Sequence, residues 1–161
     1  LEMDVIAYDP VVDDDVFVLV DVESVSFKEL LERADCVTVH APLSDVTHHM
    51  FSSNEFEMMK ESAIMVNVAR GPIVDEEALV TAIQDGEIRG AGLDVFEKEP
   101  PNGSPVLDCD NIVCSPHHAG GSPTSKQNKI EIIREELARY LRGDAPANVV
   151  NQEVFQFHGG R

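Results

Sequence analysis

The sequence predicts an α/β domain built on a doubly wound parallel sheet. Short β-rich runs alternate with amphipathic helical runs about 20–30 residues apart, which is typical of βαβ units. The chain has 161 residues, enough for one ordinary domain and too few for two. Apolar residues make up 43% of the chain, which is enough to build a core and argues against a disordered chain.

Five segments have the composition of strands. The run 63–68 is almost entirely apolar, as expected of a strand that is buried on both faces. The segment 90–94 contains Gly90 and Gly92, which leave room for a close neighbour. The predicted strands are 4–8, 36–39, 63–68, 90–94 and 112–114.

Four segments have helical patterns with defined ends. Ser26 with Glu29, and Ser52 with Glu55, have the spacing of a capping box. Gly86 is placed to end the third helix, and the fourth carries an apolar stripe at helical spacing that we expect to be core. The predicted helices are 26–34, 52–59, 75–86 and 122–143, while 13–15 is predicted to be a solvated loop.

The chain is strongly acidic: 12 Lys and Arg against 30 Asp and Glu give a formal charge of −18. Phosphate binding needs Lys and Arg, so nucleic acid is a poor partner for this surface. No apolar run approaches the length of a membrane span, so no membrane association is expected. The three cysteines form no CxxC pair, which favours a reducing cytoplasm over a disulfide framework or a zinc ribbon.

Chemically useful side chains follow the predicted strands. The carboxyl ends of parallel strands meet at one edge of the sheet, where ligands bind. The segments that follow the five strands are Asp9, 40–42, 70–71, 94–99 and 116–118. The topology therefore predicts that an acid, an arginine, glutamates and histidines converge on one crevice.

These residue types suit redox chemistry on a 2-hydroxy or 2-oxo acid. Arginine holds a carboxylate through two parallel hydrogen bonds, and histidine moves a proton near neutral pH. A nearby glutamate stabilises the imidazolium, while the hydride requires a nicotinamide cofactor. From the residues alone, Glu97 and Glu99 are equal candidates for this glutamate, and His117 and His118 are similarly ambiguous.

Five segments resemble the D-isomer-specific 2-hydroxyacid dehydrogenases, the family that includes phosphoglycerate dehydrogenase and the C-terminal-binding-protein corepressors. They are VIAYDP at 5–10, VHAPL at 39–43, VNVARGPIVD at 66–75, GAGLDVFEKEP at 90–100 and SPHHAGG at 115–121. The resemblance implies an oxidoreductase that transfers a hydride between NAD and the CH–OH group of a D-2-hydroxy acid. It leaves the particular substrate open, and it implies a homodimer.

The resemblance also assigns roles to individual residues. Arg70 would bind the substrate carboxylate, His117 would act as the acid–base group, and Glu99 would pair with that histidine. Asp9 would accept hydrogen bonds from the adenosine ribose, which favours NAD over NADP. The cofactor-binding positions that it implies are Asp9, Ala41, Pro42, Thr47, Val68, Ala69, Asp94, His117 and Gly120.

Some of these residues also have simpler structural roles as alternatives. A minor alternative for Asp9 is the role of a turn former after its strand. His118 stands where the family usually has an apolar or small residue, so it would tune the substrate pocket or face solvent. The acidic segment 13–15 has a weak alternative as a cation site, but the histidines lack recognised metal spacing and no metal is predicted.

The family's first strand and its Gly-x-Gly-x-x-Gly turn have no counterpart in these 161 residues. We therefore expect an incomplete Rossmann-like sheet, in which the strands ending at Asp9 and Val39 have no bonded path to the other three. Residues 1–143 would be an N-terminally truncated NAD-binding domain, and 144–161 a tail that returns to an absent substrate domain. This chain is expected to be inactive alone.

Two other functions are compatible with parts of the sequence. A corepressor-like module would sense NAD and recruit partners, using the same fold without turnover. The acidic loop and the alternation of strands and helices suggest a phospho-receiver domain, but such a domain has no segment that corresponds to the one around Arg70. The intact set of Arg70, Glu99 and His117 favours the enzyme.

The charge of −18 predicts a salt-adapted protein. Self-repulsion destabilises a compact acidic chain at low salt, and the Debye length shortens from about 10 Å at 0.1 M to about 3 Å at 1 M. We expect the chain to unfold at a higher temperature in 2 M KCl than in 0.1 M KCl, as measured by circular dichroism. Equal unfolding temperatures would identify an ordinary acidic protein instead.

Overall fold

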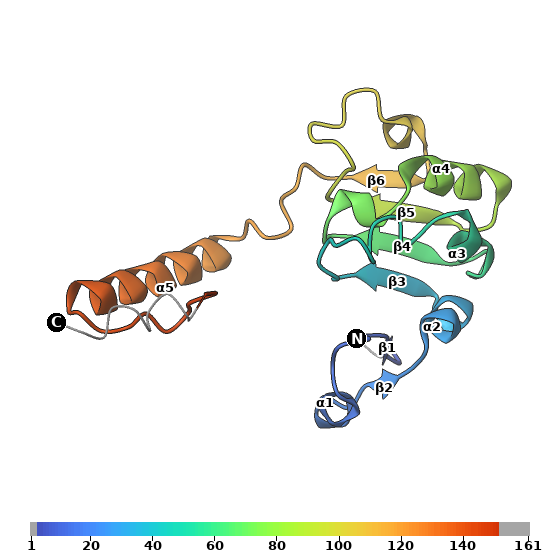
Figure 1. Cartoon of the computed structure of the whole chain (residues 1–161). Helices are drawn as coiled ribbons and strands as arrows, with labels where there is room; N and C mark the ends of the chain where they lie inside the picture. Colours follow the sequence, from blue (N-terminus) through green and yellow to red (C-terminus); the bar gives the residue numbers. More distant parts are fainter. Residues whose placement is uncertain (1–2, 152–161) are drawn as a thin grey trace. The chain divides into compact units, whose positions relative to one another are not determined.

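A computed structural model of the chain describes residues 3–151 (Figure 1). The described residues form two compact units, which divide between His117 and His118. The first contains all six strands of the described residues, and the second contains one long helix. Residues 152–161, the end of the predicted tail, lie outside the described residues.

The main sheet of the first unit has four parallel strands in the order β3–β4–β5–β6. Its register places Met65 opposite both Val37 and Ala91, and Gly92 opposite Val113. This parallel pairing confirms the predicted α/β class. The strands are β3 (Cys36–Val39), β4 (Ile64–Asn67), β5 (Gly90–Leu93) and β6 (Ile112–Cys114).

A second, two-stranded sheet precedes the main one. Its parallel strands are β1 (Ile6–Ala7) and β2 (Glu23–Ser24), and β2 was not predicted. The expectation that the strand ending at Val39 has no bonded path to the other three is wrong, because β3 pairs directly with β4. The strand that pairs with β1 is the missed β2, so the two sheets are β1–β2 and β3–β4–β5–β6.

The acidic segment 13–15 was predicted to be a loop, and this prediction is wrong. The segment caps and begins helix α1 (Asp14–Leu19). Asp13 is the N-cap residue, and Asp14 and Asp15 lie in the first turn, where carboxylates complement the helix dipole. The helix has only six residues and buries only Phe17, so the hydrophobic period that signals a helix is too short to detect.

The other four helices begin and end close to their predicted limits. Ser26 accepts a hydrogen bond from the backbone of Glu29, and the backbone N–H of Ser52 donates to the Glu55 carboxylate at 3.0 Å. Gly86 ends its helix in the left-handed conformation, at φ +80°. The helices are α2 (Phe27–Arg33), α3 (Ser53–Glu57), α4 (Glu76–Asp85) and α5 (Pro123–Leu141).

The core of the first unit lies between one face of the main sheet and its helices (Figure 1). The burial along β4 alternates, because Met65 and Asn67 are fully buried while Ile64 is 40% exposed. The prediction that this strand is buried on both faces is therefore wrong within the described residues. The largest fully buried apolar side chains are Phe56, Leu31, Met65, Ile73, Leu79 and Ile88.

Helix α5 has no buried residue, so the expectation that its apolar stripe is core is also wrong in this chain. Ser122 caps the helix by accepting from the backbone of Ser125, and Pro123 occupies the first turn, where its missing N–H costs nothing. The exposed apolar residues of this helix are Ile130, Ile132, Ile133, Leu137, Tyr140 and Leu141. Among residues 3–151, no helix combines the length and apolar character needed to cross a membrane.

The 3₁₀ turn η1 (Gly71–Ile73) lies against the segment that follows β5. A Cβ atom on Gly71 would lie 1.9 Å from the carbonyl carbon and oxygen of Phe96 and 2.5 Å from the backbone nitrogen of Glu97. No real side chain tolerates such contacts with backbone atoms. Only glycine therefore allows these two segments to approach so closely.

Gly71→Ala should lower the free energy of unfolding by about 1–3 kcal/mol or more, because the methyl group must displace the Phe96 backbone. Urea denaturation measures the change. Gly92→Ala is the matched control, since its Cβ would meet nothing closer than the Val66 side chain at 3.9 Å. Equal stability of the two variants would contradict the close packing.

Candidate active site

His117 and Glu99 form a hydrogen-bonded pair at the edge where β5 and β6 end. The His117 Nδ1 atom lies 2.8 Å from Glu99 Oε2 and 3.1 Å from Glu99 Oε1. The backbone N–H of Phe96 donates to the same carboxylate at 3.3 Å. The side chains are half exposed, 50% for His117 and 41% for Glu99, so a solute can reach them.

The hydrogen bond from His117 holds the pKa of Glu99 below its ordinary value of 4.5. The Phe96 N–H acts in the same direction, whereas partial burial and the nearby Asp94 carboxylate oppose it. An ionised Glu99 accepts a hydrogen bond from Nδ1–H, which leaves the opposite ring nitrogen, Nε2, to exchange a proton with a ligand.

His117 itself has a backbone φ of +54°, a conformation that few residues other than glycine adopt. Such a conformation costs about 1–3 kcal/mol, and it persists only where the surroundings impose it. The backbone N–H of His117 bonds to the Ser115 carbonyl at 3.1 Å, which helps to fix this turn. The turn directs the ring towards the loop that carries Glu99.

Arg70 is presented by a loop that Asn67 organises. The Asn67 side chain is fully buried at the end of β4, where its Oδ1 accepts from the Ala69 N–H and its Nδ2 donates to the Arg70 carbonyl, both at 3.0 Å. The Arg70 guanidinium is exposed and donates to the Ala69 carbonyl at 2.6 Å. The sequence analysis gave Asn67 no role.

Asp94 lies at the end of β5 and is only 5% exposed. The Ser115 hydroxyl, which follows β6, donates to its carboxylate at 2.5 Å. Burial without a hydrogen bond would be costly for such a group, and this bond offsets part of that cost. Ser115 was not among the predicted site residues.

Asp9 follows β1 and forms a turn. Its Oδ1 accepts from the backbone N–H groups of Val11 and Val12, at 2.8 and 3.2 Å. The structure therefore shows the turn-forming role, and the ribose-binding role stays a prediction. Asp9 follows a strand of the two-stranded sheet, whereas Glu99 and His117 lie at the edge of the four-stranded one.

The remaining predicted positions lie in two loops and in the second unit. Thr47 holds the loop after β3, because its hydroxyl donates to the Pro42 carbonyl at 2.7 Å and accepts from the Ser44 N–H at 2.8 Å. Ala41 lies in the same loop. Val68 and Ala69 form the loop before Arg70, while Gly120 and His118 belong to the second unit.

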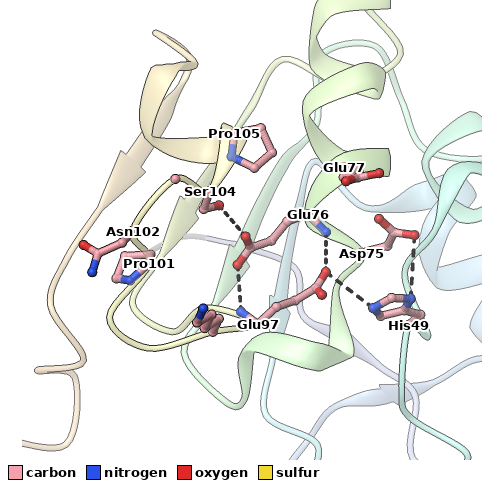
Figure 2. Close-up of a pocket in the computed structure, with 11 residues that line it drawn as sticks. His49, Asp75, Glu76, Glu77, Glu97, Pro101, Asn102, Ser104 and Pro105 are labelled. Atoms are coloured by element: carbon pink, nitrogen blue, oxygen red, sulfur yellow. Dashed lines mark hydrogen bonds and ion pairs between the residues drawn. The ribbon is translucent and has the colours of Figure 1, made fainter.

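A cavity of about 350 Å³ lies beside the Glu99 loop, at the N-terminus of α4 (Figure 2). The sequence analysis gave no role there to His49, Glu76 or Ser104, which line it. Their signal is weak, because isolated polar residues in loops have no characteristic spacing. In residues 3–151 no group of three or more His, Cys, Asp or Glu side chains is arranged to hold a metal ion.

Comparisons with known proteins assign the chain to a family. Residues 1–119 match the family described as D-isomer specific 2-hydroxyacid dehydrogenase, NAD binding domain. The chain is 42% identical over 153 residues to a glyoxylate reductase of Korarchaeum cryptofilum, a match that covers 94% of this chain and 46% of the relative. It is 41% identical over 150 residues to a D-3-phosphoglycerate dehydrogenase of Methanocaldococcus jannaschii, covering 92% of this chain and 29% of that protein.

Solved structures agree with this assignment. The D-lactate dehydrogenase of Lactobacillus jensenii with NAD⁺ superposes with a TM-score of 0.81 at 30% identity, over 90% of this chain and 47% of that one. The TT0316 protein of Thermus thermophilus gives 0.82 at 36%, over 92% and 46%. The chain therefore belongs to the D-isomer-specific 2-hydroxyacid dehydrogenases, through their Rossmann-like NAD-binding domain, and it spans less than half of these relatives' length.

His117→Ala should raise the pKa of Glu99 towards 4.5, because it removes the hydrogen bond that most stabilises the carboxylate. The ¹³C chemical shift of the Glu99 carboxyl carbon, followed against pH, measures this value. Because the folded pKa is depressed, the pair stabilises the fold at neutral pH, and this contribution is lost as the pH falls from the unfolded value through the folded one. His118→Ala is the control, and an equal rise in that variant would argue against the pairing.

Proposed function

We propose that the chain supplies the acid–base pair and the substrate-binding arginine of an NAD-dependent oxidoreductase acting on the CH–OH group of D-2-hydroxy acids. The observation that carries this proposal is the 2.8 Å hydrogen bond between His117 Nδ1 and Glu99. A histidine whose second nitrogen is left for a ligand, beside an exposed arginine segment, suits a substrate that has both a hydroxyl and a carboxylate group.

In the direction of oxidation, His117 Nε2 accepts the proton of the substrate hydroxyl. Glu99 stabilises the imidazolium that forms and holds the ring orientation, as a carboxylate does for a general base. Arg70 binds the carboxylate of the acid and so orients the carbon that loses hydride. In the reverse direction His117 donates the proton to the 2-oxo group.

The residues of the chain suit the two ends of the dinucleotide. The Asp9 carboxylate follows β1 and suits the ribose hydroxyls, with a preference for NAD over NADP, because a carboxylate repels a 2′-phosphate. Asp94 follows β5 near Glu99, while Val68 and Ala69 follow β4, and all three suit the nicotinamide end. NAD, when bound there, supplies the hydride acceptor that no side chain can provide.

Glyoxylate and hydroxypyruvate are the substrates to test first, because the relatives include a glyoxylate reductase and a glyoxylate/hydroxypyruvate reductase B. The division of the chain into an NAD-binding domain, 1–143, and a tail, 144–161, belongs to the same proposal, as does a homodimer. A cytoplasmic location is supported by the three cysteines, which are all free.

The 161 residues alone should not turn over substrate, because they contain no Gly-rich turn for the pyrophosphate. A chimera in which this chain replaces the matching part of the Korarchaeum cryptofilum reductase should oxidise NADH with glyoxylate, measured at 340 nm. In that chimera His117→Ala should lower kcat by about 10²- to 10⁴-fold, and Arg70→Ala should mainly raise KM for glyoxylate.

His118→Ala is the matched control and should retain turnover. NADH binding, followed by fluorescence, shows that each chimera is folded. A chimera that binds NADH without reducing glyoxylate or hydroxypyruvate would refute the enzymatic proposal and favour the NAD-sensing module. Equal loss of activity in His117→Ala and His118→Ala would refute the assignment of the acid–base group.

A further inference from the structure

Glu76 is one of three polar or charged residues that are buried in the described part of the chain, and it is 7% exposed. It is the first residue of α4, and its carboxylate points into the cavity shown in Figure 2. A buried carboxylate is stable only when hydrogen bonds replace its water. Its partners therefore show which part of the structure it stabilises.

Both carboxylate oxygens of Glu76 bind the loop that carries Glu99. Oε1 accepts from the backbone N–H of Glu97 at 2.7 Å, and Oε2 accepts a short hydrogen bond from the Ser104 hydroxyl. Glu97 and Ser104 are the two ends of the segment 97–104, which contains Glu99. A single side chain thus fastens this loop at both ends, and we call this arrangement the Glu76 clasp (Figure 2).

The clasp is reinforced in the opposite direction. The backbone N–H of Glu76 donates to Glu97 Oε1 at 2.9 Å, so Glu76 and Glu97 exchange two hydrogen bonds. His49 Nε2 lies 3.4 Å from the same oxygen of Glu97, and His49 Nδ1 lies 3.6 Å from Asp75, the N-cap residue of α4. The reciprocal hydrogen bonds between Glu76 and Glu97 therefore tie the loop to the start of α4.

The same stretch of backbone is where the arginine segment packs. Gly71, directly after Arg70, lies against the backbone of Phe96 and Glu97, the residue that the clasp holds. The Phe96 N–H in turn donates to the Glu99 carboxylate. Because Glu99 is 41% exposed, little side-chain packing fixes it, and its position depends on how its backbone is anchored.

We propose that Glu76 is a positioning residue of the active site, which places the Glu99 carboxylate against His117 and beside the Arg70 segment by clasping both ends of the Glu99 loop. This inference rests on the proposed function, in which Glu99 and His117 form the acid–base pair. Glu76 does not touch substrate, and it acts through the Glu97 backbone and the Ser104 hydroxyl.

The test follows the Glu99 carboxyl carbon by ¹³C NMR against pH in this chain, without substrate. Glu76→Ala removes both hydrogen bonds, so the loop loosens, the His117 bond weakens, and the pKa of Glu99 rises towards its ordinary value. Glu76→Gln should remain close to the original chain, because its amide oxygen still accepts from Glu97 and its amide group still bonds to Ser104. Glu77→Ala, the exposed neighbour on α4, should leave the pKa unchanged.

An unchanged Glu99 pKa in a folded Glu76→Ala chain would overturn the proposal, even if that variant is less stable, because stability alone would then be the role of Glu76. If Glu76→Ala does not fold, Ser104→Ala frees only one end of the loop, and it should raise the Glu99 pKa by a smaller amount. No rise in Ser104→Ala would then overturn the clasp.

In the reductase chimera, Glu76→Ala should lower kcat by about 10- to 100-fold with a smaller change in KM, because misplacing the acid–base pair affects the chemical step. The two readouts separate the two proposals. If the Glu99 pKa responds to Glu76→Ala but the chimera shows no turnover, the enzymatic function is refuted and the clasp is supported. Turnover that is unaffected by Glu76→Ala would refute the positioning role alone.

Discussion

Parallel pairing of β4, β5 and β6 is the constraint on which the candidate site depends. Because these strands run in the same direction, the residues that follow them emerge at one edge of the sheet. Arg70, Glu99 and His117 lie 18 to 47 positions apart in sequence, yet they follow three neighbouring strands. No local motif has to bring them together, since the topology of the sheet does so.

Topology alone does not fix these side chains to within a hydrogen-bond length. That precision comes from two short-range features, the absence of a Cβ atom at Gly71 and the buried carboxylate of Glu76. The first lets the loop after β4 touch the backbone of the loop after β5, and the second fastens that loop at both ends. The exposed Glu99–His117 pair is thus supported by backbone contacts that lie outside it.

The sequence predicted the elements that carry a long pattern or a strong cap. The strands β1 and β3 to β6 lie in β-rich runs, the helices α2 to α5 have caps or apolar residues at helical spacing, and the pairing of Glu99 with His117 followed from the resemblance to the family. The two-residue strand β2 and the six-residue helix α1 were missed, because neither is long enough to show a period. Because β2 was not predicted, β3 was grouped with β1 instead of with β4, β5 and β6.

The supporting groups were missed for a different reason. Asn67, Ser115, Glu76 and Ser104 act through hydrogen bonds to residues distant in sequence or to loop backbone, and such bonds leave no spacing in the chain. Burial is what distinguishes Asn67 and Glu76, and burial of a polar residue is apparent only once the fold is known. Sequence reasoning therefore finds the groups that perform chemistry more readily than the groups that hold them.

The division into two sheets has a consequence for cofactor binding. Asp9 follows a strand of the two-stranded sheet, whereas Asp94 and the Glu99–His117 pair follow strands of the four-stranded one. In the proposed function a single dinucleotide contacts Asp9 at one end and Asp94 at the other, so its binding links the two sheets. Among the described residues the links include Tyr8 packed on Phe27 and Phe27 on Phe51, at ring separations of 5.4 and 5.5 Å. A bidentate pair between Arg33 on α2 and Glu23 on β2 adds to them. Aromatic packing of this kind contributes about 1 kcal/mol per pair beyond the area it buries. A dinucleotide bound to both sheets would add its own binding free energy to these contacts and so stabilise the relative position of the sheets.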